Sequence, residues 1–142
     1  MPQAVDWAYA AGLLDGEGCI FIGRSCHTNR QHPYYNLRVA VCMTDAVALR
    51  WLRRHFGGTW TVKPTQRTKR REYVWELATS AVAPFLLGVL PFLKVKAVQA
   101  RWALRFRTTV GPRGTHRRSV RTIRRQQRLY EKLRALKLRS VS

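Results

Sequence analysis

The sequence is short of acidic residues. Its 142 residues include 7 Asp plus Glu against 27 Lys plus Arg, which gives a formal net charge of +20. Such an excess of one sign destabilises a small folded protein through self-repulsion, so it indicates a polyanionic partner. Nucleic acid is the leading candidate, because each phosphate that a cation neutralises releases a counterion. Anionic membranes and ribosomal RNA would also attract this charge.

Cysteines and long apolar runs are also scarce. Cys19, Cys26 and Cys42 are an odd number with no CxxC pair, so neither a disulfide framework nor a zinc site is indicated. The chain has no charged-then-apolar leader and no apolar run of about 18 residues. We therefore expect free thiols and a soluble intracellular protein without a membrane partner. A bacterial or phage cytoplasmic setting and an organelle fit equally well.

The apolar content is nevertheless sufficient for a packed fold. Hydrophobic residues make up 46% of the chain, including five Trp, five Tyr and five Phe. This length suits one compact domain over residues 1–142 and is too short for two well-packed ones. We expect its core at about 4–108 and a basic helical segment at about 113–142.

The hydrophobic periodicity predicts an α+β fold. Helical spacing and capping residues predict helices at 4–15, at 46–56, from Ser80 past Pro91 toward Phe106, and at 119–138. Alternation of apolar and polar residues predicts strands at 19–22, 35–41, 59–63 and 72–79. The resulting order is an αββαββα core with a further C-terminal helix. Two similar hairpins indicate one four-stranded antiparallel sheet backed by helices.

The end of the first predicted helix has an unusual run of small residues. Ala4, Ala8, Gly12 and Gly16 recur every four residues, so one side of the helix has almost no side-chain bulk. Such a side allows a second backbone to approach closely. The alternative is that Gly12 is a tolerated helix glycine, which costs about 1 kcal/mol relative to alanine.

Asp15 and Glu17 close this helix and are two of only seven acids. Glu17 stands between two glycines, where its carboxylate and the neighbouring backbone can both reach a ligand. An acid beside DNA is repulsive unless a cation intervenes, and Mg²⁺ accepts carboxylate, carbonyl and phosphate oxygens. Alternatively, Asp15 satisfies nearby backbone donors and Glu17 pairs with an arginine. The residues alone leave both interpretations open.

Residues 10–18, Ala-Ala-Gly-Leu-Leu-Asp-Gly-Glu-Gly, resemble the LAGLIDADG motif of homing endonucleases. Ala10 stands for the leading Leu, Leu14 for Ile, Gly16 for the penultimate Ala, and Glu17 for the final Asp. Residues 90–100 resemble the Pro-Phe-Leu-Lys-Leu-Lys segment of the single-motif, homodimeric members, such as the chloroplast-intron enzyme. The resemblance spans roughly residues 7–105.

This resemblance implies a metal-dependent endonuclease that acts in intron homing. Such enzymes hydrolyse one phosphodiester per strand of double-stranded DNA at a long pseudo-palindromic site and leave short 3′ overhangs. It assigns catalysis to Glu17 and Lys96, and the binding of Mg²⁺, or another divalent cation, to Glu17 and the Gly16 carbonyl. Lys94 has a structural alternative, as a lysine whose stem covers apolar surface.

The resemblance also implies a homodimer, since the chain holds one motif and two such helices pack together in the family. The expected dimer interface comprises Ala8, Gly12, Leu13 and Gly16.

The resemblance and the strand alternation together predict the residues that contact DNA. The polar strand positions are Gly23, Ser25, Asn36, Arg38, Ala40, Thr61, Lys63, Glu72 and Glu76. The hairpin loops add Arg24, Asn29, Arg30, Gln31, Gln66, Arg67, Lys69 and Arg70. Phosphate contacts are expected from Arg113, His116, Arg117, Arg118 and Arg121.

Met43 departs from the family pattern. Members often place a glutamine that orients active-site water just after the second strand, and here Met43 falls in that segment, so we group it with the DNA-contacting residues. This departure favours two rivals on the same fold, an intron RNA maturase and a non-cleaving DNA-binding protein. A third rival, an RNA-associated basic protein, rests on charge alone, and Glu17 in its glycine setting argues against it.

Overall fold

The computed structural model describes residues 1–26, 32–63, 71–110 and 119–139. The helices are α1 (Ala4–Glu17), α2 (Ala46–Phe56), α3 (Val82–Val89), α4 (Ala97–Arg107) and α5 (Val120–Arg139). The strands are β1 (Gly18–Ser25), β2 (Tyr34–Met43), β3 (Thr59–Lys63) and β4 (Glu72–Ala78). Short 3₁₀ turns, η1 (Thr79–Ala81) and η2 (Leu90–Phe92), flank α3. The predicted α+β class and element order are confirmed.

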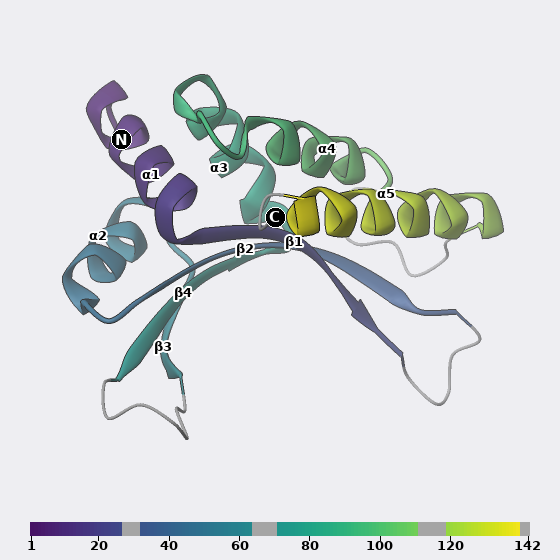
Figure 1. The fold of residues 1–142 in the computed structure, drawn as a ribbon, viewed down its shortest axis with the longest axis horizontal. Coiled ribbons are helices and arrows are strands. Elements are labelled where there is room, and N and C mark those ends of the chain that lie inside the picture. The colour runs from purple at the N-terminus through teal and green to yellow at the C-terminus, as the bar shows by residue number, and fades with distance from the viewer. Residues whose placement is uncertain (27–31, 64–70, 111–118, 140–142) are drawn as a thin grey trace.

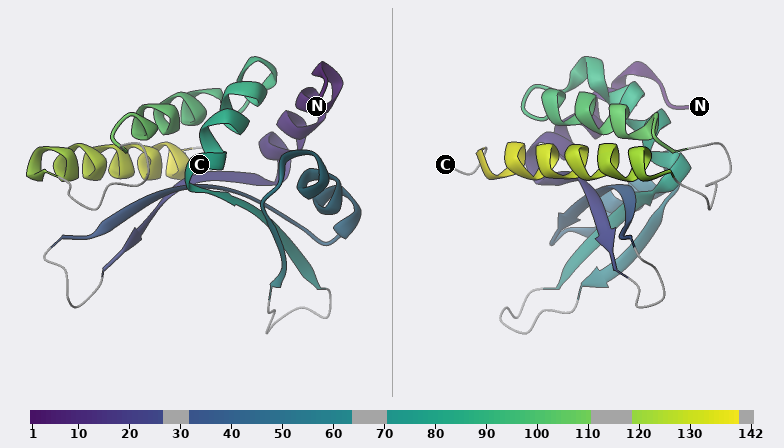
Figure 2. Two further views of the ribbon diagram at one scale, coloured as in Figure 1. Left: turned by 180° about the vertical axis from the view of Figure 1, so that it is seen from behind. Right: turned by 90° about the vertical axis from the view of Figure 1, so that its right-hand side faces the viewer.

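The four strands form one antiparallel sheet in the order β1-β2-β4-β3. The sheet is strongly curved, and the helices gather on its convex side (Figure 1). The concave side carries no helix in any of the three views (Figure 2). The fold therefore leaves one complete sheet face open to a partner.

The alternation of the strands decides which residues face the helices. Apolar side chains at every second position are buried beneath the helix layer: Ile20, Ile22, Tyr35, Leu37, Val39, Val41, Trp75 and Leu77. They join Leu14 of α1, Leu49 and Leu52 of α2, and Phe85 of α3 in one core. The intervening positions belong to the open face. One buried face in each of β1, β2 and β4 thus fixes the register of these three strands.

The first helix is longer than its sequence predicts. It continues through Gly16 and Glu17, and the N–H of Gly18 still donates to the Leu14 carbonyl. The two glycines were expected to stop the helix at Asp15. Glycine lowers helix stability without preventing a helix, and packing around Leu14, which is 0% exposed, outweighs that cost.

The helix expected to run past Pro91 is interrupted. It begins at Val82 after the η1 turn, not at Ser80, and α3 ends at Val89. Pro91 lies in the η2 turn, Leu93 has extended backbone with ψ 136°, and α4 begins only after Lys96. Proline has no N–H for a helical hydrogen bond, which explains the break. The non-helical residues 93–96 acquire a role at the site described below.

Two further expectations can be compared with the described residues. Cys19, Cys26 and Cys42 are free thiols, as expected. Among the described helices, none is long and apolar enough to cross a membrane.

Candidate metal and nucleic-acid site

Glu17 stands at the junction between α1 and the sheet. Its exposed side chain lines a cavity of about 190 Å³ together with Cys42, Met43, Thr44 and Glu72. Within the described part of the chain, its carboxylate has no hydrogen-bond or ion-pair partner. The alternative in which Glu17 pairs with an arginine is therefore not realised among these residues. The carboxylate is free to bind a cation.

Gly18 fixes the direction in which the chain leaves Glu17. A Cβ at this position would lie 2.5 Å from Leu14 Cδ1 and 2.7 Å from both the Leu14 Cα and its carbonyl oxygen. Two of these three atoms are backbone, so they have little freedom to move. The tight turn from α1 into β1, and hence the place of Glu17, requires glycine here.

Asp15 has a structural role, in contrast to Glu17. Its Oδ2 accepts a hydrogen bond from the Lys94 N–H at 2.7 Å, and its Oδ1 accepts one from the Lys96 N–H at 3.0 Å. The carboxylate thus satisfies two backbone donors of the non-helical segment that precedes α4. This matches the alternative in which Asp15 serves the backbone, although the donors are about eighty residues away in sequence.

Lys96 returns to the same point on α1. Its Nζ donates to the Asp15 carbonyl oxygen at 2.7 Å, and its side chain is partly buried. Carbonyl groups at a helix C-terminus carry partial negative charge, which favours an ammonium group there. The Lys96 ammonium is therefore bound to a residue that lies two positions before Glu17 in the sequence. Lys94, in contrast, has an exposed side chain and contributes its backbone N–H.

Glu72 is a second carboxylate on the rim of this cavity. Cys42 Sγ donates to Glu72 Oε2 at 3.6 Å, and Lys63 Nζ lies 3.7 Å from the same oxygen. Burial raises the pKa of the Cys42 thiol, and the negative charges of Glu72 and Glu17 raise it further, while Lys63 opposes them. The thiol therefore stays protonated at neutral pH and remains a donor.

The oxygen donors around Glu17 suit a hard cation in part. Among the described residues, no group of three or more His, Cys, Asp or Glu side chains is arranged to enclose a metal. Mg²⁺ is commonly bound by one or two carboxylates, with waters and substrate phosphates completing its coordination. One unpartnered carboxylate at an open cavity fits that mode and does not fit a closed structural site.

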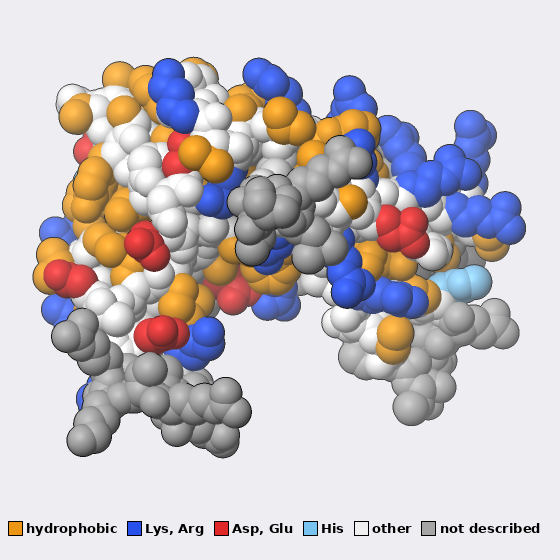
Figure 3. Space-filling view, in the orientation of Figure 1, with side chains coloured by type: hydrophobic (Ala, Val, Ile, Leu, Met, Phe, Trp, Pro, Cys, Tyr) orange, Lys and Arg blue, Asp and Glu red, His pale blue; other side chains and the backbone are white. Residues whose placement is uncertain are grey.

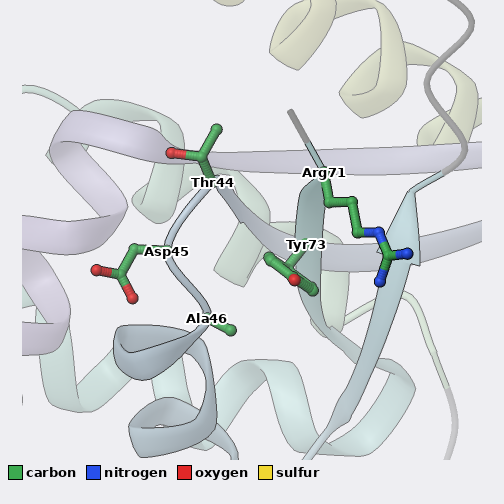
Figure 4. Close-up of a pocket in the computed structure, with 5 residues that line it drawn as sticks. All are labelled: Thr44, Asp45, Ala46, Arg71 and Tyr73. Carbon is green, nitrogen blue, oxygen red and sulfur yellow. The ribbon is translucent and has the colours of Figure 1, made fainter. Parts of the chain in front are cut away.

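A shallow depression of about 500 Å³ adjoins the Glu17 cavity, and Thr44 lines both. Figure 4 shows its other lining residues, Asp45 and Ala46 from the β2–α2 turn and Arg71 and Tyr73 from the start of β4. Asp45 caps α2 by accepting from the Val47 N–H at 2.9 Å. Met43 is half-buried against the core, so an apolar group forms this wall of the cavity.

The open sheet face collects the polar strand positions named above. Residues that pair across neighbouring strands form three rows on this face: Phe21–Arg38–Ala78, Cys19–Ala40–Glu76–Thr59 and Cys42–Val74–Thr61. Gly23 pairs with Asn36 beyond the first row. Lys63 pairs with Glu72 at one end of the sheet, and Ser25 pairs with Tyr34 at the other. Arg38 and Glu76 form an ion pair with a 2.5 Å separation between Nη1 and Oε1. The face thus presents fixed donors next to fixed acceptors.

Among the described residues, the outer side of α1 is uncovered at Gly12 and Gly16, whereas Tyr9 contacts Trp51 of α2. Ala8, Gly12 and Gly16 are exposed, Leu13 is half-buried, and a Cβ added at Gly12 or Gly16 would meet no atom within 4 Å. Val5 and Tyr9 on the same side are 71% and 49% exposed. This stripe, which we call the outer side of α1, is flat and partly apolar.

Several predicted contact residues lie outside the described part of the chain. These are Asn29, Arg30, Gln31, Gln66, Arg67, Lys69, Arg70, Arg113, His116, Arg117 and Arg118. Arg24 is the last residue but one of β1, and Arg121 lies in the first turn of α5, both exposed. Sequence reasoning missed Cys42 as a cavity residue, although its place in the alternation of β2 assigns it to the open face.

No family model matches the chain, and no curated protein matches it either. Solved structures do. The chain aligns over 94% of its length, and over 82% of the other chain, with the homing endonuclease I-CvuI in complex with its target, at TM-score 0.78 and 18% identity. The archaeal intron-encoded homing endonuclease I-Vdi141I, complexed with DNA, aligns over 93% and 84%, at TM-score 0.78 and 15% identity.

The chain has the LAGLIDADG homing-endonuclease fold. The LAGLIDADG homing endonuclease I-GzeII, solved with a DNA target, aligns over 91% of this chain at TM-score 0.66 and 11% identity, but over only 43% of its own chain. The LAGLIDADG fold of residues 1–142 thus corresponds to less than half of that larger protein. Residues 10–18, which resemble the motif, span the end of α1 and the first residue of β1, and Glu17 is the last acid of that segment.

Proposed function

We propose that the protein is a site-specific, metal-dependent DNA endonuclease that acts as a homodimer on long pseudo-palindromic duplex sites, in intron homing. The observation that carries the proposal is the unpartnered carboxylate of Glu17, in a protein of net charge +20, at the end of the motif helix. DNA-bound homing endonucleases with the same fold support the class of substrate.

Glu17 and the Gly16 carbonyl would hold Mg²⁺ or another divalent cation, with phosphate oxygens and water as its other ligands. When bound, the ion supplies charge neutralisation at the phosphodiester and activation of water. Lys96 adds a positive charge that Asp15 holds in place, and it is suited to stabilise negative charge on the phosphate. I-CvuI has been solved with its target in the presence of Ca²⁺, and with the I-CreI target in the presence of Mg²⁺, where the DNA is not cleaved. Both structures support a divalent cation beside bound DNA.

The open sheet face would lie on the DNA. Its paired side chains suit base edges, because arginine donates to guanine and carboxylates accept from cytosine. Asn36, Thr61 and the Arg38–Glu76 pair are placed for this, and Arg24 is placed for phosphates.

Two chains would meet through the outer side of α1. The 43% coverage of I-GzeII supports this pairing, because a longer protein can hold two such units in one chain. A symmetric pair brings two Glu17 carboxylates to one duplex, one for each strand.

The test is cleavage of a randomised duplex library with and without Mg²⁺, comparing the native protein with Glu17→Gln. Native protein should yield cut sequences with two-fold related ends, whereas Glu17→Gln should bind the selected site and leave it intact. Glu131→Gln, an acid on α5 away from the cavity, is the matched control and should cut normally. Cleavage by Glu17→Gln would refute the assignment of Glu17.

The half-buried Met43 in the cavity wall favours one alternative, a DNA-binding protein that does not cleave. In that case the library would yield bound but uncut sequences with native protein in Mg²⁺. Enrichment of RNA in preference to duplex DNA would favour a maturase.

A further inference from the structure

Helices α4 and α5 carry a second group of cations that the sheet does not share. The exposed basic residues on their outward side, here called the α4–α5 surface, are Arg101, Arg105, Arg121, Arg124, Arg125, Arg128 and Lys132. On α5, Arg121, Arg124, Arg128 and Lys132 recur at intervals of three or four residues, and Arg125 follows Arg121 by four, so the five share one side of the helix. Buried Ile123, Gln126, Leu129 and Leu133 occupy the opposite side.

Several of these cations are held in fixed positions. The Arg105 guanidinium lies 4.3 Å from the centre of the Trp102 ring, and the Lys132 ammonium lies 5.2 Å from it. Gln126 Nε2 donates to Thr109 Oγ1 at 3.0 Å, which ties α5 to the end of α4. Cation–π contacts reduce but do not remove repulsion between like charges. The arrangement therefore favours an anionic partner.

Acidic residues are distributed differently over the two charged surfaces. Two ion pairs lie on the sheet, one between Arg38 and Glu76 and one between Lys63 and Glu72. Helix α4 contains no acid and α5 contains one, Glu131. Paired donors and acceptors suit the reading of bases, whereas unpaired cations suit phosphates irrespective of sequence.

The α4–α5 surface points away from the concave side of the sheet. Helices α4 and α5 lie on the convex side in both views of Figure 2. In Figure 3, Lys and Arg side chains gather over this part of the molecule, on the side opposite the open sheet face. A straight duplex on the concave face would therefore leave these cations unneutralised.

We infer that the α4–α5 surface binds a second segment of double-stranded DNA without regard to sequence. The partner is DNA because a protein that works on one duplex always meets others at high local concentration, and a straight cationic helix matches a regular row of phosphates. From Val120 to Lys137 the helix is about 27 Å long, and duplex DNA carries one charge per about 1.7 Å of its axis. A protein with two such faces can transfer between DNA segments while it searches for its site.

This inference rests on the proposed function for the duplex on the sheet, and the experiment separates the two. The full chain in EDTA is mixed with two duplexes of unrelated sequence, one with a donor dye and one with an acceptor dye. Energy transfer between them reports bridging, while anisotropy of one labelled duplex alone reports binding. Loss of all duplex binding would refute the proposed function as well, whereas binding without bridging would refute only this inference.

The decisive variant is Arg124→Gln/Arg128→Gln. It should reduce bridging strongly and lower the slope of log affinity against log salt for the second duplex by about 2, since each phosphate contact contributes about 0.9. Arg53→Gln/Arg54→Gln on α2 removes the same charge from exposed helical positions and should change neither. Equal losses in both variants would show that net charge alone is responsible, which overturns the proposal. Structured RNA that displaces the second duplex at lower nucleotide concentration than DNA would also overturn it.

Discussion

The two sides of α1 are built from similarly small residues but have different surroundings. On the inner side, Ala10 and Ala11 are 1% and 0% exposed and let the helix pack closely on its own chain. On the outer side, a Cβ placed on Gly12 or Gly16 would meet no atom of another described element within 4 Å. Small residues allow close packing on both sides of α1. Among the described residues, other elements pack closely against Ala10 and Ala11 on the inner side, and none approaches Gly12 or Gly16 on the outer side.

The two acids at the end of α1 differ in the same way. Asp15 accepts two backbone hydrogen bonds from residues 94 and 96, whereas Glu17 has no partner in the described part of the chain. Two carboxylates that are two residues apart in sequence therefore have different roles. One holds the fold together, and the other is available to a ligand.

The largest expected effect comes from filling the outer side of α1. Gly12→Leu adds a bulky side chain where two helices would pack, and overpacking costs typically about 1–3 kcal/mol. Two-fold symmetry applies this cost twice, so the dimer dissociation constant should rise at least about 30-fold. Analytical ultracentrifugation over a concentration series measures it.

Ala135→Leu is the control, because it places a leucine at an exposed position of another helix, α5. It should leave the dimer intact. An unchanged dissociation constant for Gly12→Leu would show that the chains pair through another surface. The outer side of α1 would then not be a packing surface for a second chain.

A middle-sized effect is expected on the inner side. Asp15→Ala removes the acceptor for two N–H groups, and the free energy of unfolding should fall by about 2 kcal/mol. The melting temperature should fall by about 8 °C for a chain of this size. Glu17→Ala should change stability by less than about 0.5 kcal/mol, since its carboxylate stabilises nothing in the described part of the chain. Urea denaturation at one protein concentration compares them, and equal losses would contradict the division of roles.

How far the sequence predicts these features depends on the range of the interactions. The bounds of α2 and β3 follow from local signals, the Asp45 cap and the Gly57–Gly58 pair, and the structure has them at the predicted residues. Period-two alternation also assigns Arg38 and Glu76 to one face, because a strand has only two. The partners of Asp15 are not predictable in this way, since they depend on where the chain breaks after Pro91 and returns to α1.

The Glu17 cavity illustrates the same limit. Helix periodicity and the motif indicate Glu17, but its neighbours Cys42 and Glu72 come together only through the pairing of β2 with β4, thirty residues apart. No local sequence pattern predicts the register in which β2 pairs with β4. Sequence therefore predicts the single candidate acid, and the structure supplies the surroundings that leave it open.

The smallest expected effect concerns the bond that joins Lys96 to the end of α1. Lys96→Met keeps the apolar stem and removes the 2.7 Å contact between Nζ and the Asp15 carbonyl oxygen. Because that carbonyl lies at a partly exposed helix end, where water can replace the ammonium, the loss of stability should be about 1 kcal/mol. Lys94→Met is the matched control and should change stability less, since Lys94 contributes its backbone N–H.

Under the proposed function, Lys96→Met should also slow cleavage while duplex affinity, measured by anisotropy, stays nearly constant. If affinity falls as much as cleavage does, Lys96 positions the phosphate in the ground state, and the inner end of α1 contributes to DNA binding as well as to the fold.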